Sequence, residues 1–209
     1  MKLPGKTIER LSQYRRILLN CLDIGKTHIY SYELANMLNI TAVQVRRDIM
    51  LMGYSTSLKK GYDINDLIKV IGSILDTRKG QNVAVIGVGN LGRAITGYFM
   101  GKRSKLNIVA TFDTDPSKVN RVISGVNCYP IQQLAEMVKD LGIHIAILTV
   151  PPDHAASVAE SLVIAGIKGI LNFTSVSLNV SSHVYLEEYD MITSIEKVAY
   201  FVKKNISVS

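Results

Sequence analysis

The 209-residue sequence predicts an α/β protein with two parts, a helical N-terminal domain followed by a domain built on a parallel sheet. From residue 82 onward, apolar runs without alternation are separated by stretches of helical periodicity, which is typical of strands buried on both faces. Before residue 80 the pattern is instead one of short helices and turns. A content of 47% hydrophobic residues is enough to enclose packed cores.

Charge is divided unevenly between the two parts. The first 79 residues carry 13 of the 24 Lys and Arg residues but 7 of the 17 Asp and Glu residues, a net charge of +6, whereas the rest of the chain carries +1. A basic part beside a nearly neutral part indicates two domains with different partners, one of them a polyanion.

The N-terminal domain, residues 1–79, is predicted to hold four helices and a wing. Apolar residues recur at three-to-four spacing over residues 6–24, which predicts the first helix. The second begins at the N-cap Ser31, and the third at Thr41, whose spacing from Gln44 is that of a capping box. Two short helices across a three-residue turn make a helix-turn-helix candidate. The stretch "GYSTSLKKGYDI" then predicts a hairpin wing, and residues 65–76 predict a fourth helix.

The third helix is the candidate for reading DNA. In the major groove Arg favours guanine and Gln favours adenine, each through two hydrogen bonds, and lysines suit phosphates or the minor groove. The candidate DNA-binding residues are Thr41, Gln44, Arg46, Arg47, Lys59 and Lys60. The alternative is an ordinary helical domain with a solvated basic face.

The second domain, residues 80–190, begins in the polar linker "TRKGQ". Strands are predicted at "NVAVIG", "LNIVATFD", "IHIAILTV" and "GILNF", with helices near residues 90–101, 131–141 and 153–165. Residues 182–190 predict a last strand, and residues 192–205 predict a last helix. Strands that alternate with helices indicate a Rossmann-like parallel sheet.

A glycine-rich turn, "GVGNLG", follows the first of these strands and opens a helix. The first glycine permits the tight turn, the second lets the backbone approach a pyrophosphate, and the third lets the helix pack on the strand. The phosphates would lie on the helix N-terminus, where N–H groups and the dipole attract anions. The next strand ends at Asp113, near the position of the acid that binds the ribose and disfavours a 2′-phosphate. The expected cofactor is therefore NAD(H).

The expected cofactor-binding residues comprise this turn, the acid, and the carboxyl end of a later strand, where open sheets bind ligands. They are Gly87, Val88, Gly89, Asn90, Leu91, Gly92, Asp113, Val150 and Pro151. Lys118 and Arg121 follow Asp113 and leave NADP(H) open. The alternative is a Rossmann-like turn that binds another ligand or none.

The sequence offers little for catalysis beside the turn. A dehydrogenase needs a substrate pocket and a proton donor or acceptor at the nicotinamide, but the sheet takes up nearly all residues after the linker. We expect His144 to pack or to face solvent. We expect His154, at a strand's carboxyl end, to touch the cofactor or to cap a helix. The expected protein is not an enzyme.

The sequence lacks the signals that are typical of membrane, secreted and metal-binding proteins. No apolar run approaches the roughly 20 residues of a membrane span, and the N-terminus has no signal-peptide pattern. Cys21 and Cys128 lie far apart and read as reduced core residues, and the four histidines have no metal-ligand spacing. We therefore expect a cytoplasmic protein without a metal or a membrane partner.

Four segments together resemble one protein family: "ERLSQYRRIL", "TAVQVRRDI", "GVGNLGRAI" with "FDTDP", and "VPPDHAASVAESLVIAGIKGILNF". From end to end the sequence resembles the Rex family of redox-sensing transcriptional repressors. The resemblance implies a winged helix, an NAD(H)-binding Rossmann domain, and a homodimer whose C-terminal helix, residues 191–209, is exchanged between protomers. It also implies that the protein represses genes of anaerobic or fermentative metabolism at double-stranded operator DNA, and that NADH releases it.

The resemblance also assigns roles to single residues. It makes Gln44, Arg46 and Arg47 the base-reading candidates, and it implies a polar coupling between Arg16, Tyr98 and Asp190 that differs between bound states. Two other functions stay open: a small NAD-dependent oxidoreductase, and a repressor gated by another nucleotide.

Two segments depart from the family pattern. The wing reads "STSLKKGY" where the family is usually glycine-rich, so wing contacts are expected to shift to Lys59 and Lys60. The stretch "NFTS" replaces the family's "NFAP", which affects the contacts expected of Thr174 and Ser175 near the cofactor.

Overall fold

The computed structural model describes residues 3–55, 60–99 and 105–206, the last three of these by backbone alone. The chain folds as two compact units, Met1–Arg78 and Lys79–Ser209. Each unit encloses a hydrophobic core of its own. In the described ranges no helix combines the length and the apolar character that crossing a membrane requires.

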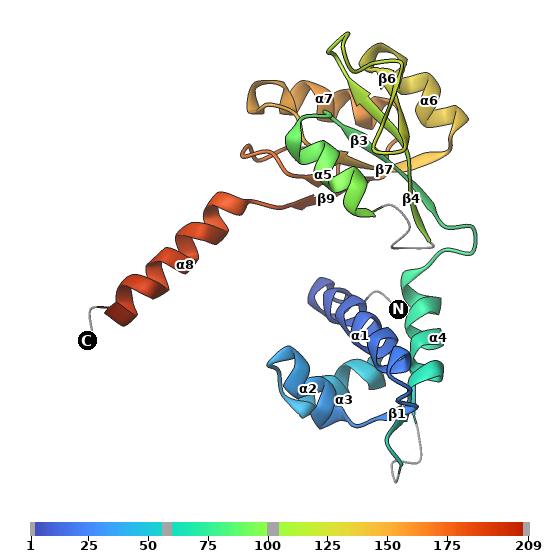
Figure 1. Ribbon diagram of the computed structural model, residues 1–209, viewed down its shortest axis with the longest axis vertical. Coiled ribbons are helices and arrows are strands. Elements are labelled where there is room, and N and C mark those ends of the chain that lie inside the picture. The colour runs from blue at the N-terminus through green and yellow to red at the C-terminus, as the bar shows by residue number, and fades with distance from the viewer. Residues whose placement is uncertain (1–2, 56–59, 100–104, 207–209) are drawn as a thin grey trace. The chain divides into compact units, whose positions relative to one another are not determined.

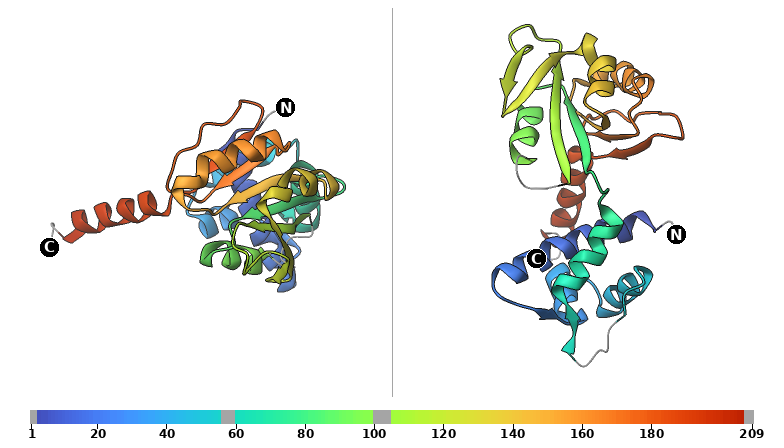
Figure 2. Two further views of the ribbon diagram at one scale, coloured as in Figure 1. Left: turned by 90° about the horizontal axis from the view of Figure 1, so that it is seen from above. Right: turned by 90° about the vertical axis from the view of Figure 1, so that its right-hand side faces the viewer.

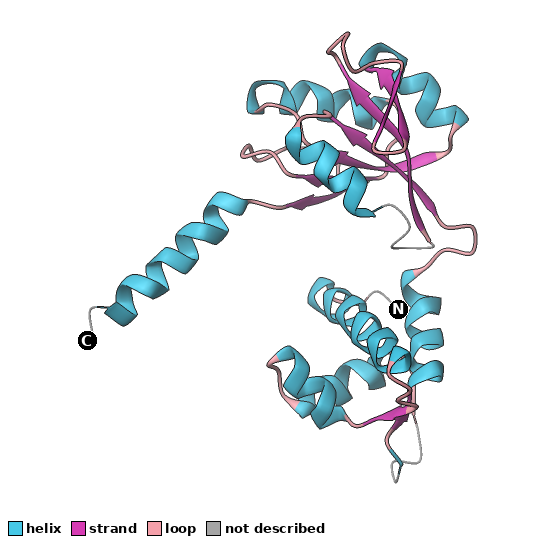
Figure 3. Cartoon of the chain, in the orientation of Figure 1, coloured by secondary structure: helices cyan, strands magenta, loops and turns pink. Residues whose placement is uncertain are grey.

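The first unit is built from α1 (Gly5–Asp23), α2 (Ser31–Leu38), α3 (Ala42–Leu51) and α4 (Ile64–Leu75), with two short strands (Figure 3). α1 packs on α4, and α2 packs on α3. The core contains apolar residues from all four helices, which include Leu11, Leu18, Leu34, Val45, Ile49, Leu67 and Ile71. The predicted helices are confirmed within one or two residues.

The two short helices begin in different ways. Thr41 caps α3 as predicted, because its Oγ1 accepts the N–H of Gln44 at 3.2 Å. The prediction that Ser31 caps α2 is wrong, since Ser31 is already helical and Tyr30 is the N-cap. The N–H of Tyr30 donates to the Glu33 carboxylate at 2.8 Å, so an acid three residues on stabilises this helix start.

The described part of the wing differs from the predicted hairpin. β2 (Tyr62–Asp63) pairs antiparallel with β1 (His28–Ile29), which lies between α1 and α2. Gly61 makes this pairing possible, because its φ is +82° and a Cβ there would lie 2.8 Å from the carbonyl oxygen of Ile29. Lys60 is exposed, and Lys59 lies outside the described residues.

The second unit contains a sheet whose described strands follow the order β5-β6-β4-β3-β7-β8-β9. All neighbours pair in parallel except β5, which pairs antiparallel with β6 at one edge. The strands are β3 (Gln81–Ile86), β4 (Leu106–Asp113), β5 (Arg121–Ile123), β6 (Val126–Pro130), β7 (Ile143–Leu148), β8 (Gly169–Asn172) and β9 (Tyr185–Glu188). The predicted parallel sheet is confirmed.

Helices cover both faces of this sheet (Figure 2). α5 (Asn90–Phe99) lies on one face, where Val83 and Val85 of β3 pack with Ile95. α6 (Leu134–Asp140), which follows a single 3₁₀ turn, and α7 (Pro152–Ile164) lie on the other face with Ala84 and Ile86. The alternation of side chains along β3 therefore separates two apolar layers, as a doubly wound fold requires.

The hairpin of β5 and β6 lies outside the strands predicted from the sequence. Its turn is Ser124-Gly125, with φ of +49° and +83°. Two consecutive residues with positive φ form the turn that joins two antiparallel strands most tightly. The alternation in "RVISGVNCYP" around Ser-Gly is the signal that was available for this hairpin.

The chain ends in α8 (Met191–Ile206), which follows β9 (Figure 1). All side chains that the structure describes in this helix are exposed. Several are large and apolar: Ile192, Ile195, Val198, Phe201 and Val202. The helix therefore presents apolar surface that its own unit leaves uncovered.

Candidate functional site

A cavity of about 650 Å³ opens at the carboxyl ends of β3, β4 and β7. The chain turns back at this point of the sheet, since β4 lies on one side of β3 and β7 on the other. Open α/β sheets bind ligands at such a switch point. The polar or glycine residues in its lining are Gly87, Gly89, Asp113, Thr114, Asp115, Lys118, Thr149, His154 and Ser157.

Glycine suits each of the three motif positions for a different structural reason. Gly87 has a φ of +89°, and a Cβ there would lie 2.8 Å from the carbonyl oxygen of Thr149. A Cβ on Gly92 would lie 2.1 Å from the carbonyl oxygen of Gly87, so α5 could not pack so close to the turn. A Cβ on Gly89 would meet no protein atom within 4 Å, although Gly89 lines the cavity. A glycine at position 89 thus lets a ligand approach the protein backbone, where a side chain would block it, as the motif predicts for a pyrophosphate.

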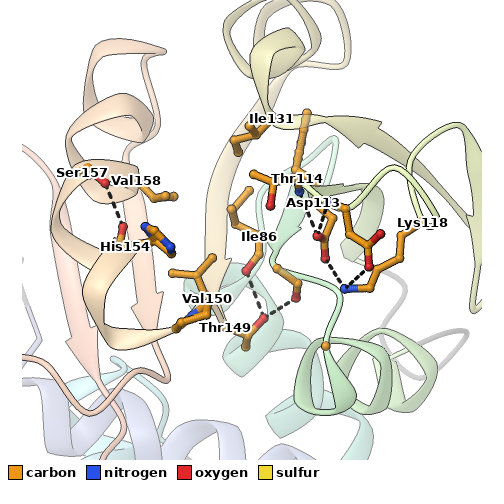
Figure 4. Close-up of a pocket in the computed structure, with 15 residues that line it drawn as sticks. Ile86, Asp113, Thr114, Lys118, Ile131, Thr149, Val150, His154, Ser157 and Val158 are labelled. Atoms are coloured by element: carbon orange, nitrogen blue, oxygen red, sulfur yellow. Dashed lines mark hydrogen bonds and ion pairs between the residues drawn. The ribbon is translucent and has the colours of Figure 1, made fainter.

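Thr149 holds the turn in place. Its hydroxyl contacts the carbonyl oxygens of Ile86 at 3.0 Å and of Gly87 at 2.7 Å, and its N–H donates to Ile86 (Figure 4). Thr149 was not among the predicted site residues. Its place one residue after β7, directly before Val150, was the available signal.

Asp113 lies on the opposite side of the cavity from His154 and Val158 (Figure 4). Its Oδ1 accepts the N–H groups of Thr114 at 2.8 Å and Asp115 at 3.0 Å, and its Oδ2 accepts the N–H of Val88 at 2.7 Å. Burial disfavours the charged form, but these donors outweigh it and hold the pKa of Asp113 below its usual range. The carboxylate is therefore charged and fixed.

Lys118 lies between two carboxylates of the cavity. Its Nζ is 3.2 Å from Oδ2 of Asp113 and 3.4 Å from Oδ2 of Asp115. Two acids and one base give this end of the cavity a net negative charge. Such a subsite suits the hydroxyl groups of a ribose better than a 2′-phosphate.

The structure brings five of the predicted cofactor residues to the cavity wall: Gly87, Gly89, Asp113, Val150 and Pro151. The other four do not line it. Asn90, Leu91 and Gly92 form the first turn of α5, and Val88 is fully buried with its N–H bound to Asp113. Helix N-termini offer N–H groups that lack carbonyl partners in the helix, so the first turn of α5 suits a phosphate.

A second cavity, of about 230 Å³, also contacts Val150 and lies where β8 and β9 end. Thr174 and Ser175 line it, together with Tyr189 and Asp190. The Thr174 hydroxyl donates to Oδ1 of Asn172, a buried residue, at 2.7 Å. The "NFTS" stretch is thereby held at the edge of the ligand-binding end of the sheet.

The exposed face of α3 contains the basic residues predicted to read DNA. Arg46 and Arg47 line an open hollow of about 460 Å³ with Val43 and Met50. A guanidinium nitrogen of Arg46 donates to Ser31 Oγ at 3.1 Å. Gln44 is half-buried beside this face, and its amide bonds to Asp48 rather than back to the cap residue.

The three residues of the expected coupling lie on separate elements. Arg16 is exposed on α1, and Tyr98 is exposed on α5. Asp190 directly precedes α8, where its carboxylate accepts the N–H groups of Ile192 at 2.8 Å and Thr193 at 3.2 Å. These bonds identify Asp190 as the cap of α8. The Thr193 hydroxyl also donates to this carboxylate, and this bond, followed by the N–H bonds, lowers the pKa of Asp190.

The described residues include no group of three or more His, Cys, Asp or Glu side chains that could hold a metal ion. Cys21 and Cys128 are both buried and free. His144 is exposed, and His154 lines the first cavity.

Both units are similar to known families. Residues 78–176 match the family described as "CoA binding domain", and residues 2–49 match the family described as "Putative DNA-binding protein N-terminus". The chain is 37% identical to a "Redox-sensing transcriptional repressor Rex" of Bacillus licheniformis, over 97% of this chain and 94% of that protein. It is also 37% identical to the protein of that name from Levilactobacillus brevis, over 97% and 95%.

Solved structures of RSP, a Rex-family repressor, are similar over the whole chain. The complex of RSP with β-NAD+ and operator DNA has a TM-score of 0.90 at 31% identity and covers 100% of this chain and 96% of its own. The complex with β-NADH has a TM-score of 0.85 at 31% identity and covers 100% and 98%. The similarity therefore includes both units.

Proposed function

The chain belongs to the Rex family of redox-sensing transcriptional repressors, and we propose on this premise that it binds operator DNA through α3 and NAD(H) at the glycine turn. NADH releases the protein from DNA, so that transcription follows the ratio of NADH to NAD+. The observation that carries the cofactor site is the glycine at position 89, in the wall of the cavity at the switch point. Neither a close protein contact nor a positive φ requires a glycine there.

The dinucleotide is sensed and is not consumed. Relatives that match nearly the whole chain are repressors by name, which supports this reading over an oxidoreductase. The cavity wall offers His154 as a group that could exchange a proton, so the distinction needs a test. Purified protein should leave NADH unchanged when keto acids or aldehydes are added. Protein-dependent loss of NADH with such a substrate would establish the oxidoreductase instead.

DNA contacts are assigned to the cap and outer face of α3 and to the wing. The proposed residues are Thr41, Gln44, Arg46, Arg47, Lys59 and Lys60. Arg46 and Arg47 line the hollow and are exposed, which supports base contacts, because a reading helix must present its donors to the groove. The lysines are assigned to phosphates.

The functional unit is assigned as a homodimer with domain limits of 1–79, 80–190 and 191–209. The uncovered apolar side chains of α8 support an exchange of this helix between two copies, since burying them would stabilise the pair. Sedimentation of Ile195→Asp with Val198→Asp tests this assignment. Both positions are exposed in the single chain, so a monomer should result without loss of folding.

The decisive experiment selects DNA from a pool of random duplexes and then challenges the complex with nucleotides. We expect a palindromic motif, because a two-fold dimer meets two half-sites. NADH should release the DNA and NAD+ should not. A selected motif with release by a different adenine nucleotide would favour the repressor gated by another ligand. The absence of any enriched motif would contradict DNA reading.

A further inference from the structure

A buried acid on α3 lies behind the face of that helix to which the reading of DNA is assigned, and its role rests on that proposed function. Asp48 is fully buried. Its carboxylate accepts two bonds from Arg10 of α1, at 2.6 and 2.8 Å, and one from the Tyr14 hydroxyl at 2.8 Å. Burial disfavours its charge, but the bonds from Arg10 and Tyr14 outweigh burial and hold the pKa of Asp48 below its usual range. Asp48 is thus a fixed anion behind the reading face.

The same carboxylate also binds Gln44, one turn earlier on α3. The two side chains meet at 3.0 Å through Nε2 of Gln44 and Oδ1 of Asp48. The two ends of an amide are hard to distinguish by shape, but an ionised carboxylate can only accept hydrogen bonds. The amide must therefore turn its nitrogen toward Asp48. Asp48 fixes which way Gln44 points.

This bond changes what Gln44 can offer to a base. A free amide has two N–H donors and one oxygen acceptor. With one N–H committed to Asp48, one donor and one acceptor remain. In the major groove adenine presents one acceptor and one donor, whereas guanine presents two acceptors. The remaining groups match adenine and cannot supply the two donors that guanine needs.

We propose that Asp48 is a positioning residue for DNA reading, which leaves Gln44 with one donor and one acceptor and so strengthens its preference for adenine over guanine. Asp48 touches no base in this role. It acts through Gln44, which is half-buried beside the face that carries Arg47.

The test begins with the full-length parent and the motif selected from random duplexes. Gln44→Met, which keeps the length of the side chain, identifies the base pair that Gln44 faces, because preference should be lost at that pair alone. At this pair the parent should bind adenine about tenfold more tightly than guanine, as expected for two hydrogen bonds to one base. A motif that does not change in Gln44→Met would overturn the proposal.

Removing Asp48 alone would leave the partly buried guanidinium of Arg10 without its carboxylate and the buried hydroxyl of Tyr14 without its acceptor, which is destabilising. The informative variant replaces three bonded partners together, as Arg10→Met, Tyr14→Phe and Asp48→Leu, because replacing such partners jointly by apolar residues costs less than removing one of them. In this variant the side-chain amide of Gln44 is free to rotate. We expect the variant to bind the motif and still to prefer adenine, as a free Gln does, but by a factor several-fold smaller than in the parent, because the freed amide can also turn its donors toward guanine. Retention of the parent's preference would overturn the role of Asp48.

A second measurement needs only the parent and altered DNA. Replacing the adenine by 7-deazaadenine removes its acceptor, and replacing it by purine removes its amino donor. Each change should weaken binding of the parent several-fold and should leave Gln44→Met unaffected. If the parent tolerates either change, Gln44 does not offer one donor and one acceptor. A parent that selects no motif would instead contradict the proposed DNA binding itself.

Discussion

The main-chain N–H of Val88 donates a 2.7 Å hydrogen bond to Oδ2 of Asp113, which ties the end of β4 to the glycine turn. A carboxylate offers about four acceptor positions. Three main-chain N–H groups and Lys118 occupy them. A ribose hydroxyl would therefore reach Asp113 most easily by replacing Lys118, which makes its longest bond at 3.2 Å. The acid that sequence spacing predicted for cofactor choice thus also holds the turn.

A substitution of Asp115 should change the choice between NADH and NADPH with less effect on the fold than a substitution of Asp113. Asp115→Asn removes one negative charge beside Lys118 and leaves the Val88–Asp113 bond in place. We expect the parent to bind NADH more tightly than NADPH, and Asp115→Asn to narrow the ratio several-fold. Asp113→Asn should instead weaken both ligands and lower the midpoint of unfolding, because an amide nitrogen would face a main-chain N–H. Calorimetric titration at low salt measures the ratios, and equal affinities of the parent would contradict this account.

Alanine substitutions at two motif glycines should have different effects, one on NADH binding and the other on the free energy of unfolding. Gly89→Ala adds a Cβ where no protein atom lies within 4 Å, so the free energy of unfolding should change little while NADH binding weakens at least tenfold. Gly92→Ala places a Cβ 2.1 Å from the carbonyl oxygen of Gly87, and this overlap should cost about 1–3 kcal/mol of stability. Urea unfolding and NADH titration of both variants make the comparison. Unweakened binding in Gly89→Ala would remove the argument for a pyrophosphate at the turn.

Acid should unfold the first unit through Asp48. Its pKa is lowered by folding, so its stabilising effect is complete above the ordinary value of 3.8 and is lost as the pH falls below it. The free energy of unfolding of the parent should be nearly constant from pH 7 to about 5 and should fall below about pH 4. The variant Arg10→Met, Tyr14→Phe, Asp48→Leu should show a shallower fall. Identical slopes would mean that Asp48 contributes nothing to acid unfolding.

The coupling between ligands should depend on the charge of Asp190. Because this carboxylate also caps α8, an alanine would confuse two effects, whereas Asp190→Asn keeps a good cap and removes the charge. We expect Asp190→Asn and Arg16→Gln to bind NADH normally but to change the factor by which operator DNA weakens NADH binding. That factor must equal the one by which NADH weakens DNA binding. Unchanged factors in both variants would exclude these residues from the switch.

Periodicity predicted the four N-terminal helices because each has one apolar face. It predicted the parallel sheet because its strands are apolar on both faces. The hairpin of β5 and β6 was missed, since its strands are short and β5 lies at the edge of the sheet. The motif located Gly87 and Asp113, but Thr149 joined the site only through the pairing of β3 with β7. The pair of Arg10 and Asp48 spans 38 residues, and no local pattern reveals a contact at that separation.

The two cores share no member among the described residues, since one draws on residues up to Ile71 and the other on residues from Ala84 onward. Amide hydrogen exchange should therefore show two separately opening regions. A ligand held at 100 times its Kd slows exchange about a hundredfold in the region whose opening releases it. NADH should protect β3 and α5, and DNA should protect α3. An amide in one region whose protection changes when the other region's ligand is added then reports the transmission of the redox signal directly.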